Sequence, residues 1–334
     1  MPRAFEWTGS VRKMRLRKGG RSFAYAGRVV VITGGSRGLG LLMARELKKQ
    51  GARLALLARN REELMRAKED LDGRHALAIT CDVGDRAQVQ QAMDIVMQHF
   101  GRIDVLVNNA GVIQVGPLQH MTYGDYHQAM NVHFWGAFHC TEAVLPHMRQ
   151  RRSGRIVNIA SIGGLVAVPH LAPYTASKFA LVGYSNAVRA EVARDGIRVT
   201  TVCPGLMRTG SAINAQMKGR HEAEFAWFAA LSSMPLLSID ARRAARKIVA
   251  AARRGEPNLT ITPQARLLAL LDRLMPNALA RVMVMANRML PGPESLWGNE
   301  SWPGRESRPR QLPRLVTLLG DRAAVRNNEM VLTR

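Results

Sequence analysis

Short apolar runs alternate with helical segments through most of the chain. Six runs have the length and composition of buried strands: 28–33, 53–58, 76–82, 103–108, 155–160 and 197–203. The clearest helical patterns between and after them cover 41–50, 89–100, 123–145 and 174–193. Near-continuous apolar strands that alternate with helices indicate a parallel sheet with helices on both faces. The pattern therefore predicts an α/β fold with a doubly wound sheet.

Polar and glycine-rich sequence follows several of these strands directly. Parallel sheets of this kind bind ligands beyond the carboxyl ends of their strands. The residues at those ends are a glycine-rich turn after the first strand, Asp82, Asn108–Asn109, Ser161 and Pro204–Gly205. We therefore expect a ligand site along this edge of the sheet.

The turn after the first strand is typical of dinucleotide binding in a Rossmann-type fold. It reads Gly34-Gly-Ser-Arg-Gly-Leu-Gly40 and leads into the helical segment 41–50. Its glycines allow a tight turn and a close approach, so that N–H groups at the helix N-terminus can receive a pyrophosphate.

The cations near this turn indicate which dinucleotide binds. Arg59 ends the second strand, where an acidic residue would bind the 2′-hydroxyl of NAD, and Arg37 lies within the turn. Both cations suit a 2′-phosphate. NADP(H) is therefore expected in preference to NAD(H).

Tyr174 and Lys178 form the second chemical motif. They are four residues apart in a helix that starts after Pro173, so both side chains emerge on one face. A free tyrosine has a pKa of about 10, and an ammonium group one helical turn away favours its phenolate. Ser161, at the end of the preceding strand, can hydrogen-bond a substrate oxygen. The set predicts proton transfer at a carbonyl or alcohol oxygen.

Taken together, these motifs resemble the short-chain dehydrogenase/reductase (SDR) family, in the branch with a TGxxxGxG turn and a YxxxK pair. The matching sequences span about residues 26–255: Thr33–Gly40, Asn108–Gly111, Asn131, Ser161, Tyr174-x-x-x-Lys178 and Pro204–Gly205. The resemblance implies an NAD(P)-dependent oxidoreductase that interconverts an alcohol and a ketone or aldehyde by hydride transfer. It also implies a homodimer or homotetramer, since family members usually pair through the helices after strands four and five.

The resemblance assigns roles to the matching residues. Tyr174 would be the catalytic acid/base, Lys178 would lower its pKa and hold the nicotinamide ribose, and Ser161 would orient the substrate oxygen. Asn131 would hold a water that relays protons towards Lys178. Some of the implied cofactor contacts belong to one part of the dinucleotide: Asp82 and Val83 to the adenine, Asn109 to the adenosine ribose, and Thr209 to the nicotinamide carboxamide. The other implied contacts are Gly34, Ser36, Arg37, Gly38, Leu39, Gly40, Arg59, Tyr174, Lys178, Pro204 and Gly205.

Composition and charge bear mainly on compartment and partners. Hydrophobic residues make up 47% of the chain, enough for a sizeable core. Cys81, Cys140 and Cys203 are far apart in apolar sequence, which indicates buried thiols in a reducing compartment and no disulfide framework; no metal site is expected.

The net charge of +23 lies mostly in the flanks. Residues 1–28 hold eight Lys and Arg against one acid, and residues 241–334 hold seventeen against seven. Such flanks are either simply solvated or attract anionic lipid or nucleic acid. Nucleic acid is not expected as a partner, because no aromatic-interleaved basic patch or zinc-finger spacing accompanies the charge.

Three regions are expected along the chain. Residues 1–25 form a basic arm without the apolar stretch of a secretory signal, 26–255 the Rossmann-fold catalytic domain, and 256–334 a helical extension with a loose basic tail. Two amphipathic stretches, 264–275 and a second after Pro276, are too short to span a bilayer. They could cover the active site, seal a subunit contact or lie on an anionic membrane surface. The segment 292–313 is predicted to be irregular.

The segment after Gly205 is expected to be a substrate lid. Its apolar residues, Phe225, Trp227 and Phe228 among them, either cover a bulky apolar substrate or pack the lid onto the core. The preferred function is an NADP-dependent carbonyl reductase or alcohol dehydrogenase, cytoplasmic or peripheral at a membrane surface. The alternative is a non-catalytic NADP-binding scaffold or redox sensor, which would not need the complete set of proton-transfer residues.

Overall fold

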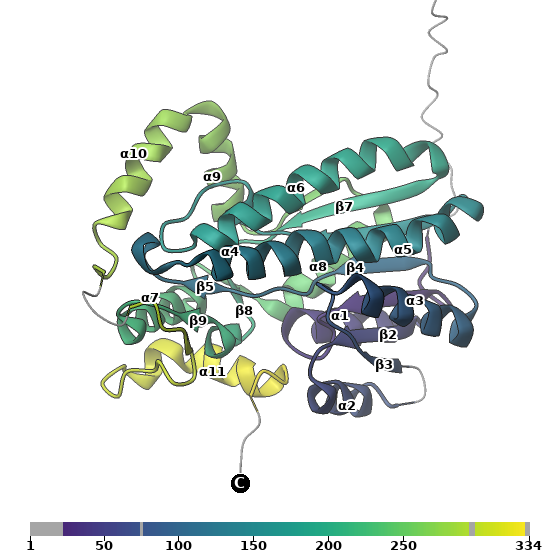
Figure 1. Cartoon of the computed structure of the whole chain (residues 1–334), viewed down its shortest axis with the longest axis horizontal. Helices are drawn as coiled ribbons and strands as arrows, with labels where there is room; N and C mark the ends of the chain where they lie inside the picture. The colour runs from purple at the N-terminus through teal and green to yellow at the C-terminus, as the bar shows by residue number, and fades with distance from the viewer. Residues whose placement is uncertain (1–22, 74–75, 294–297, 331–334) are drawn as a thin grey trace, which may run out of the picture.

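A seven-stranded parallel sheet forms the centre of the molecule, with helices on both faces (Figure 1). The computed structural model describes residues 23–73, 76–293 and 298–330, so most of the predicted N-terminal arm lies outside it. The strand order is β11-β7-β6-β4-β1-β2-β3. The strands are β1 (Val29–Thr33), β2 (Arg53–Ala58), β3 (Ala76–Thr80), β4 (Val105–Asn108), β6 (Gly154–Ile159), β7 (Ile197–Cys203) and β11 (Asn258–Thr260).

The predicted doubly wound fold is confirmed, and one strand was missed. Six of the seven strands match the predicted apolar runs, while β11 pairs with β7 over only three residues. All five residues of β1 are buried because helices cover both faces of the central strands. This double burial explains why the strands are apolar throughout rather than alternating.

Two groups of helices make the outer layers. One face is covered by α1 (Gly38–Lys49), α2 (Arg61–Asp70) and α8 (Ala241–Arg254), whose apolar residues share a core cluster with β1 and β2. The other is covered by α3 (Arg86–Phe100), α5 (Gly136–Gln150) and the end of α6 (Ala172–Val192). Cys81, Cys140 and Cys203 are all buried as free thiols, as predicted.

The helix predicted over 123–145 is divided. It consists of α4 (Tyr123–Met130), a π-helical turn (Asn131–Trp135) and α5, which runs on to Gln150. A π-turn adds a residue to the helical repeat and changes the direction of the side chains on it, and such turns are frequent at functional sites. The apolar periodicity of the sequence does not indicate where this π-helical turn lies.

The chain beyond 255 returns to the body. Helices α9 (Pro263–Leu274) and α10 (Pro276–Asn287) form where amphipathic stretches were predicted, and they stand out from the body (Figure 1). The prediction of an irregular segment over 292–313 is wrong for part of it, because β12 (Trp302–Pro303) pairs with β9 (Gln216–Met217), which also pairs with β5 (Gln114–Val115). The predicted loose tail contains α11 (Arg314–Arg326), which packs on α7 (His221–Ser233).

Candidate active site

The glycine-rich turn between β1 and α1 is closed so tightly that it leaves no room for side chains. A Cβ on Gly40 would lie 2.1 Å from the carbonyl oxygen of Gly34. Gly34 itself has a φ of +61°, which favours glycine, and its Cβ would lie 2.9 Å from the Cα of Ala110. The Nδ2 of Asn109 donates to the carbonyls of Thr33 and Gly34. The turn therefore holds the N-terminal amides of α1 beside the end of β4.

The two predicted phosphate-binding cations have different surroundings. Arg59 is exposed at the end of β2. Arg37 lies with its Nη1 2.8 Å from Oε1 of Glu63, on α2, and the Ser36 hydroxyl donates to the other oxygen of Glu63. Glu63 was not predicted as a site residue, because its position in the first turn of α2 does not indicate that it reaches the glycine turn.

The other predicted cofactor contacts also follow strands at this edge. Asp82 and Val83 come after β3, where Oδ1 of Asp82 accepts a hydrogen bond from the amide of Gly84. After β7, the carbonyl of Pro204 accepts from the amide of Ile162, next to Ser161, at 2.8 Å. This bond ties the end of β7 to the end of β6. Thr209 is buried just after the short strand β8 (Met207–Arg208).

Ser161, Tyr174 and Lys178 meet between the end of β6 and the first turns of α6. A Cβ on Gly163 would lie 3.5 Å from Oγ of Ser161 and 3.3 Å from Cε1 of Tyr174, so hydroxyl and phenol ring flank the same glycine. The Nζ of Lys178 lies 5.6 Å from the centroid of the Tyr174 ring and donates to the carbonyl of Ile159 at 2.9 Å. The helical spacing of Tyr174 and Lys178 thus brings them to the hydroxyl that follows the strand.

Burial governs the proton affinities of this group. It raises the pKa of Tyr174, and the hydrogen bond with Ser161 opposes the rise. Burial also lowers the pKa of Lys178 to about 7, so its ammonium form is only partly populated near neutrality. Burial is the larger effect on the pKa of Tyr174 in this conformation, and the role of Lys178 in lowering that pKa stays a prediction.

Asn131 begins the π-helical turn, and its side chain lies against the turn that follows β3. A Cβ on Gly84 would lie 2.1 Å from the Nδ2 of Asn131. The carbonyl of Asn131 accepts a hydrogen bond from the amide of Gly136, five residues on. The structure therefore packs the amide of Asn131 beside Gly84, and among the described residues no hydrogen bond joins this amide to Lys178, whose Nζ donates to the carbonyl of Ile159.

His133 connects the π-helical turn to α6, a contact that was not predicted from the sequence. Its Nε2 accepts from the amide of Val112, so Nδ1 carries the proton and donates to the Ser177 hydroxyl at 2.7 Å. Ser177 in turn donates to the carbonyl of Tyr174 at 2.8 Å. Burial and the nearby Lys178 hold the pKa of His133 well below its usual range. A neutral imidazole with one tautomer therefore fixes the first turn of α6.

The lid helix α7 is fastened to the loop before Tyr174 by a buried carboxylate. Glu224 lies with Oε1 2.8 Å from Nδ1 of His170, and its Oε2 accepts from Nε1 of Trp227 at 2.7 Å. Phe225 and Phe228 of the same helix belong to an apolar cluster against which Tyr174 packs. The predicted lid thus lies on the catalytic side of the molecule.

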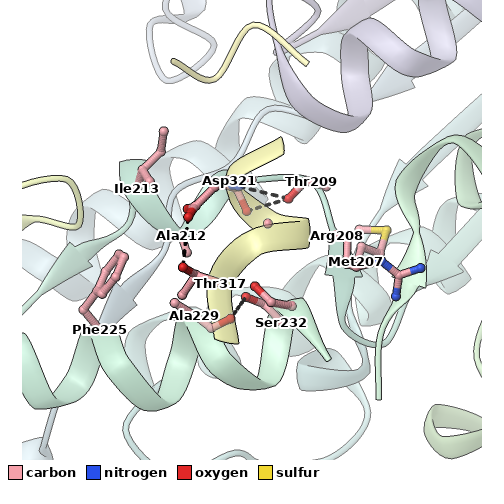
Figure 2. A pocket seen from close by; sticks show the side chains of 14 residues that line it. Met207, Arg208, Thr209, Ala212, Ile213, Phe225, Ala229, Ser232, Thr317 and Asp321 are labelled. Carbon is pink, nitrogen blue, oxygen red and sulfur yellow. Dashed lines mark hydrogen bonds between the residues drawn. The ribbon is translucent and has the colours of Figure 1, made fainter. Parts of the chain in front are cut away.

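A small cavity lies beside α11, and Tyr174 is not among the residues that line it (Figure 2). Its volume is about 20 Å³, room for a single water molecule. It is lined by residues of the segment after β7, of α7 and of α11, among them Thr209, Gly210, Phe225, Ser232, Thr317 and Asp321. The cavity is therefore a packing gap between the lid and α11, and it is too small for an organic substrate.

Comparison with known proteins identifies the family. The model of the short chain dehydrogenase family matches residues 28–219. The chain belongs to this family. It is 37% identical over 196 residues to the Anopheles gambiae protein named "Dehydrogenase/reductase SDR family protein 7-like". This match covers 57% of this chain and 62% of that protein. It is 40% identical over 189 residues to the oxidoreductase UcpA of Salmonella typhimurium, over 56% of this chain and 72% of that protein.

A solved structure supports the same assignment. The crystal structure of a short-chain dehydrogenase from Streptomyces avermitilis superposes with a TM-score of 0.66 at 30% identity, covering 78% of this chain and 98% of that one. This short-chain dehydrogenase is therefore an oxidoreductase of the NAD(P)-using SDR type, with the Rossmann fold that the sequence predicted.

The described residues contain neither a membrane-spanning helix nor a cluster of metal ligands. No helix there is both long enough and apolar enough to cross a membrane. In the same residues, no three His, Cys, Asp or Glu side chains gather as ligands for a metal ion.

Proposed function

We propose that this short-chain dehydrogenase interconverts an alcohol and a ketone or aldehyde with NADP(H), using Tyr174 as the acid/base. The observation that carries the proposal is the meeting of Ser161, Tyr174 and Lys178 beside Gly163, at the edge of the sheet that holds the glycine turn. A hydroxyl and a phenol that flank one glycine, with an amine 5.6 Å from the phenol ring centroid, supply the groups that proton transfer to a substrate oxygen requires.

Each side chain has a distinct part in this proposal. In reduction the Tyr174 hydroxyl gives its proton to the substrate oxygen, and in oxidation the phenolate takes the proton back. Ser161 donates a hydrogen bond to the same oxygen as negative charge develops on it. Lys178, when protonated, stabilises the phenolate, and Asn131 is proposed to hold a water for the proton relay. His133 and Ser177 keep the first turn of α6 in place.

The glycine turn fits a dinucleotide. Its glycines add no side chains of their own at the N-terminus of α1, where a pyrophosphate would approach, and Asn109 holds that geometry. The cofactor, when bound, supplies or accepts the hydride. We propose that Gly34, Ser36, Gly38, Leu39, Gly40, Asp82, Val83, Asn109, Pro204, Gly205 and Thr209 contact it, with Arg37 and Arg59 on the 2′-phosphate.

Replacement of Arg37 by alanine tests the preference for NADP(H). We expect the ratio of the dissociation constants for NAD+ and NADP+ to fall about tenfold, the effect of losing one charge-assisted hydrogen bond. Titration calorimetry with both nucleotides measures this ratio, and changes that affect both alike cancel in it. An unchanged ratio would show that Arg37 does not bind the 2′-phosphate.

An apolar substrate is proposed from the surroundings of Tyr174. Its ring packs against the cluster formed by Val115, Leu171, Phe225 and their neighbours, which favours an apolar group at the reacting carbon. We expect NADPH oxidation to be faster with long apolar ketones than with short polar ones of the same carbonyl reactivity. The reverse order would refute the apolar site, and cofactor binding without turnover on any compound would favour a scaffold or redox sensor.

Two kinds of assembly are also proposed. Trp135, beside α5, and Phe179, on α6, are 45% and 44% exposed, which supports a homodimer or homotetramer through these helices. A monomer in sedimentation equilibrium would contradict this assembly.

Exposed apolar residues on α9 and α10, next to Arg266, Arg273, Arg281 and Arg288, support contact of a cytoplasmic protein with an anionic membrane surface. Failure to sediment with anionic vesicles would contradict the membrane contact.

A further inference from the structure

The residues that follow α11 lie across the glycine turn. The carbonyl of Asn327 accepts a hydrogen bond from the amide of Gly38 at 2.9 Å. Gly38 is the first residue of α1, so its N–H is one of the helix-terminal donors that have no partner within the helix. Such donors receive the pyrophosphate in dinucleotide-binding folds. The backbone of Asn327 thus occupies a position that the cofactor would need.

Glu329 places a negative charge at the same helix N-terminus. Its carboxylate is almost fully buried, and Oε2 lies 3.2 Å from Nε of Arg37 and accepts from Nδ2 of Asn214 at 2.7 Å. A Cβ on Gly38 would lie 2.4 Å from Oε1, so the carboxylate stands directly over the turn. An anion at a helix N-terminus beside an arginine has the chemistry of a bound phosphate.

The side chains of Asn327 and Asn328 reach both ends of the proposed cofactor site. Nδ2 of Asn328 donates to the carbonyls of Ser36 and Glu63 at 2.9 and 3.1 Å. Nδ2 of Asn327 donates to the carbonyl of Thr209, the proposed nicotinamide contact, at 2.8 Å. One three-residue segment therefore bonds to the turn at the adenosine side and to Thr209 at the nicotinamide side.

Helix α11 holds this segment in place through contacts that do not involve the cofactor site. Its residue Ala324 lies against Gly210, where a Cβ would approach the Cα of Ala324 to 2.3 Å. Arg308 forms two hydrogen bonds with the carboxylate of Asp321. The helix can therefore remain on α7 while the residues after it change position.

We propose that residues Asn327–Glu329 are an autoinhibitory plug: they and the dinucleotide compete for the glycine turn, and the cofactor binds only when the plug leaves. This inference rests on the proposed function, because it takes the glycine turn as the cofactor site.

The plug is expected to respond to pH. Burial raises the pKa of Glu329 from 4.5 to about 7, opposed by Arg37 and the hydrogen bond from Asn214, while the charge of Glu63 adds to the rise. A carboxyl with a higher pKa when docked takes up a proton on docking, so docking weakens as the pH rises from 4.5 to 7. The apparent affinity for NAD+ should therefore rise about tenfold between pH 5.5 and 7.5. In E329Q, which cannot ionise, this rise should be absent; an equal rise in both proteins would contradict the role of Glu329.

The direct test compares two full-length variants with the unaltered chain by titration calorimetry with NADP+. The double variant Asn328→Ala, Glu329→Ala should bind about tenfold more tightly, because these two side chains no longer hold the plug on Ser36, Arg37 and Glu63. Glu306→Ala is the matched control: it removes the same charge from an exposed residue that pairs with Arg305, and its affinity should stay unchanged.

Amide hydrogen exchange of the unaltered chain supplies a second measurement that needs no variant. Saturation with NADP+ should speed exchange in residues 327–330 and leave α11 protected. Equal affinities of the double variant and the unaltered chain, or a protected segment in the complex, would overturn the plug alone. Absence of NADP+ binding to any of these proteins would overturn the proposed function together with the plug.

Discussion

Replacing Tyr174 with phenylalanine is expected to lower turnover about a thousandfold while the dissociation constant of the cofactor changes less than about twofold. The change removes the hydroxyl that gives or takes the proton, and general acid–base catalysis contributes about two to four powers of ten. The ring, its packing against the lid cluster and the contacts of α6 all remain. Steady-state rates with NADPH and a reactive ketone, together with calorimetry, measure the two quantities.

Tyr184→Phe is the matched control for this experiment. Tyr184 also lies on α6, and its replacement removes the same kind of hydroxyl from a residue outside the Ser161, Tyr174 and Lys178 set. Its turnover should stay within about twofold of the unaltered enzyme, since it removes no proposed proton donor. The assignment of Tyr174 would be wrong if the Tyr174 variant kept a tenth or more of the activity.

Gly40→Ala is expected to weaken cofactor binding about tenfold to a hundredfold and to destabilise the fold. The new Cβ would lie 2.1 Å from the carbonyl oxygen of Gly34 and 2.7 Å from Nδ2 of Asn109. Both atoms are held by the hydrogen bond that fixes the turn, so α1 must shift. The N–H groups at its N-terminus then no longer point at the pyrophosphate. Lost hydrogen bonds to a charged ligand cost about 1.5–3 kcal/mol each, and overpacking costs about 1–3 kcal/mol of stability.

Gly183→Ala separates this steric effect from the general effect of a methyl group in a helix. No atom lies within 4 Å of a Cβ placed on Gly183, in the interior of α6. Alanine there should raise the free energy of unfolding by up to about 1 kcal/mol. Thermal melts and NADP+ titrations of both variants decide the matter. If Gly40→Ala melts and binds like Gly183→Ala, the turn is not as closely packed as described.

The sheet and most of its helices could be predicted because their signals are local. A strand such as Val29–Thr33 is buried on both faces, so every residue is apolar and the run stands out. The helix that carries Tyr174 and Lys178 has Pro173 in its first turn, where proline fits, and spacing alone places both side chains on one face. The strand β11 was missed because three residues carry too little pattern.

The contacts around the site depend on residues that are distant in the chain. His133 acquires its role only when the π-helical turn packs on α6 and the amide of Val112 donates to its ring. Glu224 and His170 are 54 residues apart, and nothing in either neighbourhood indicates that they form a buried pair. Burial raises the pKa of Tyr174, and this burial depends on residues far apart in the chain, such as Val115 and Phe225.

The sequence by itself determined the parallel sheet, the glycine turn and the Ser161, Tyr174 and Lys178 set, because helical period, strand period and turn chemistry act over a few residues. The tertiary structure alone decided what lies on that turn. Glu329 is almost three hundred positions from Gly38, and its carboxylate reaches the N-terminus of α1 only because α11 folds back onto α7. Such a contact follows from the packing of whole helices, which no local pattern encodes.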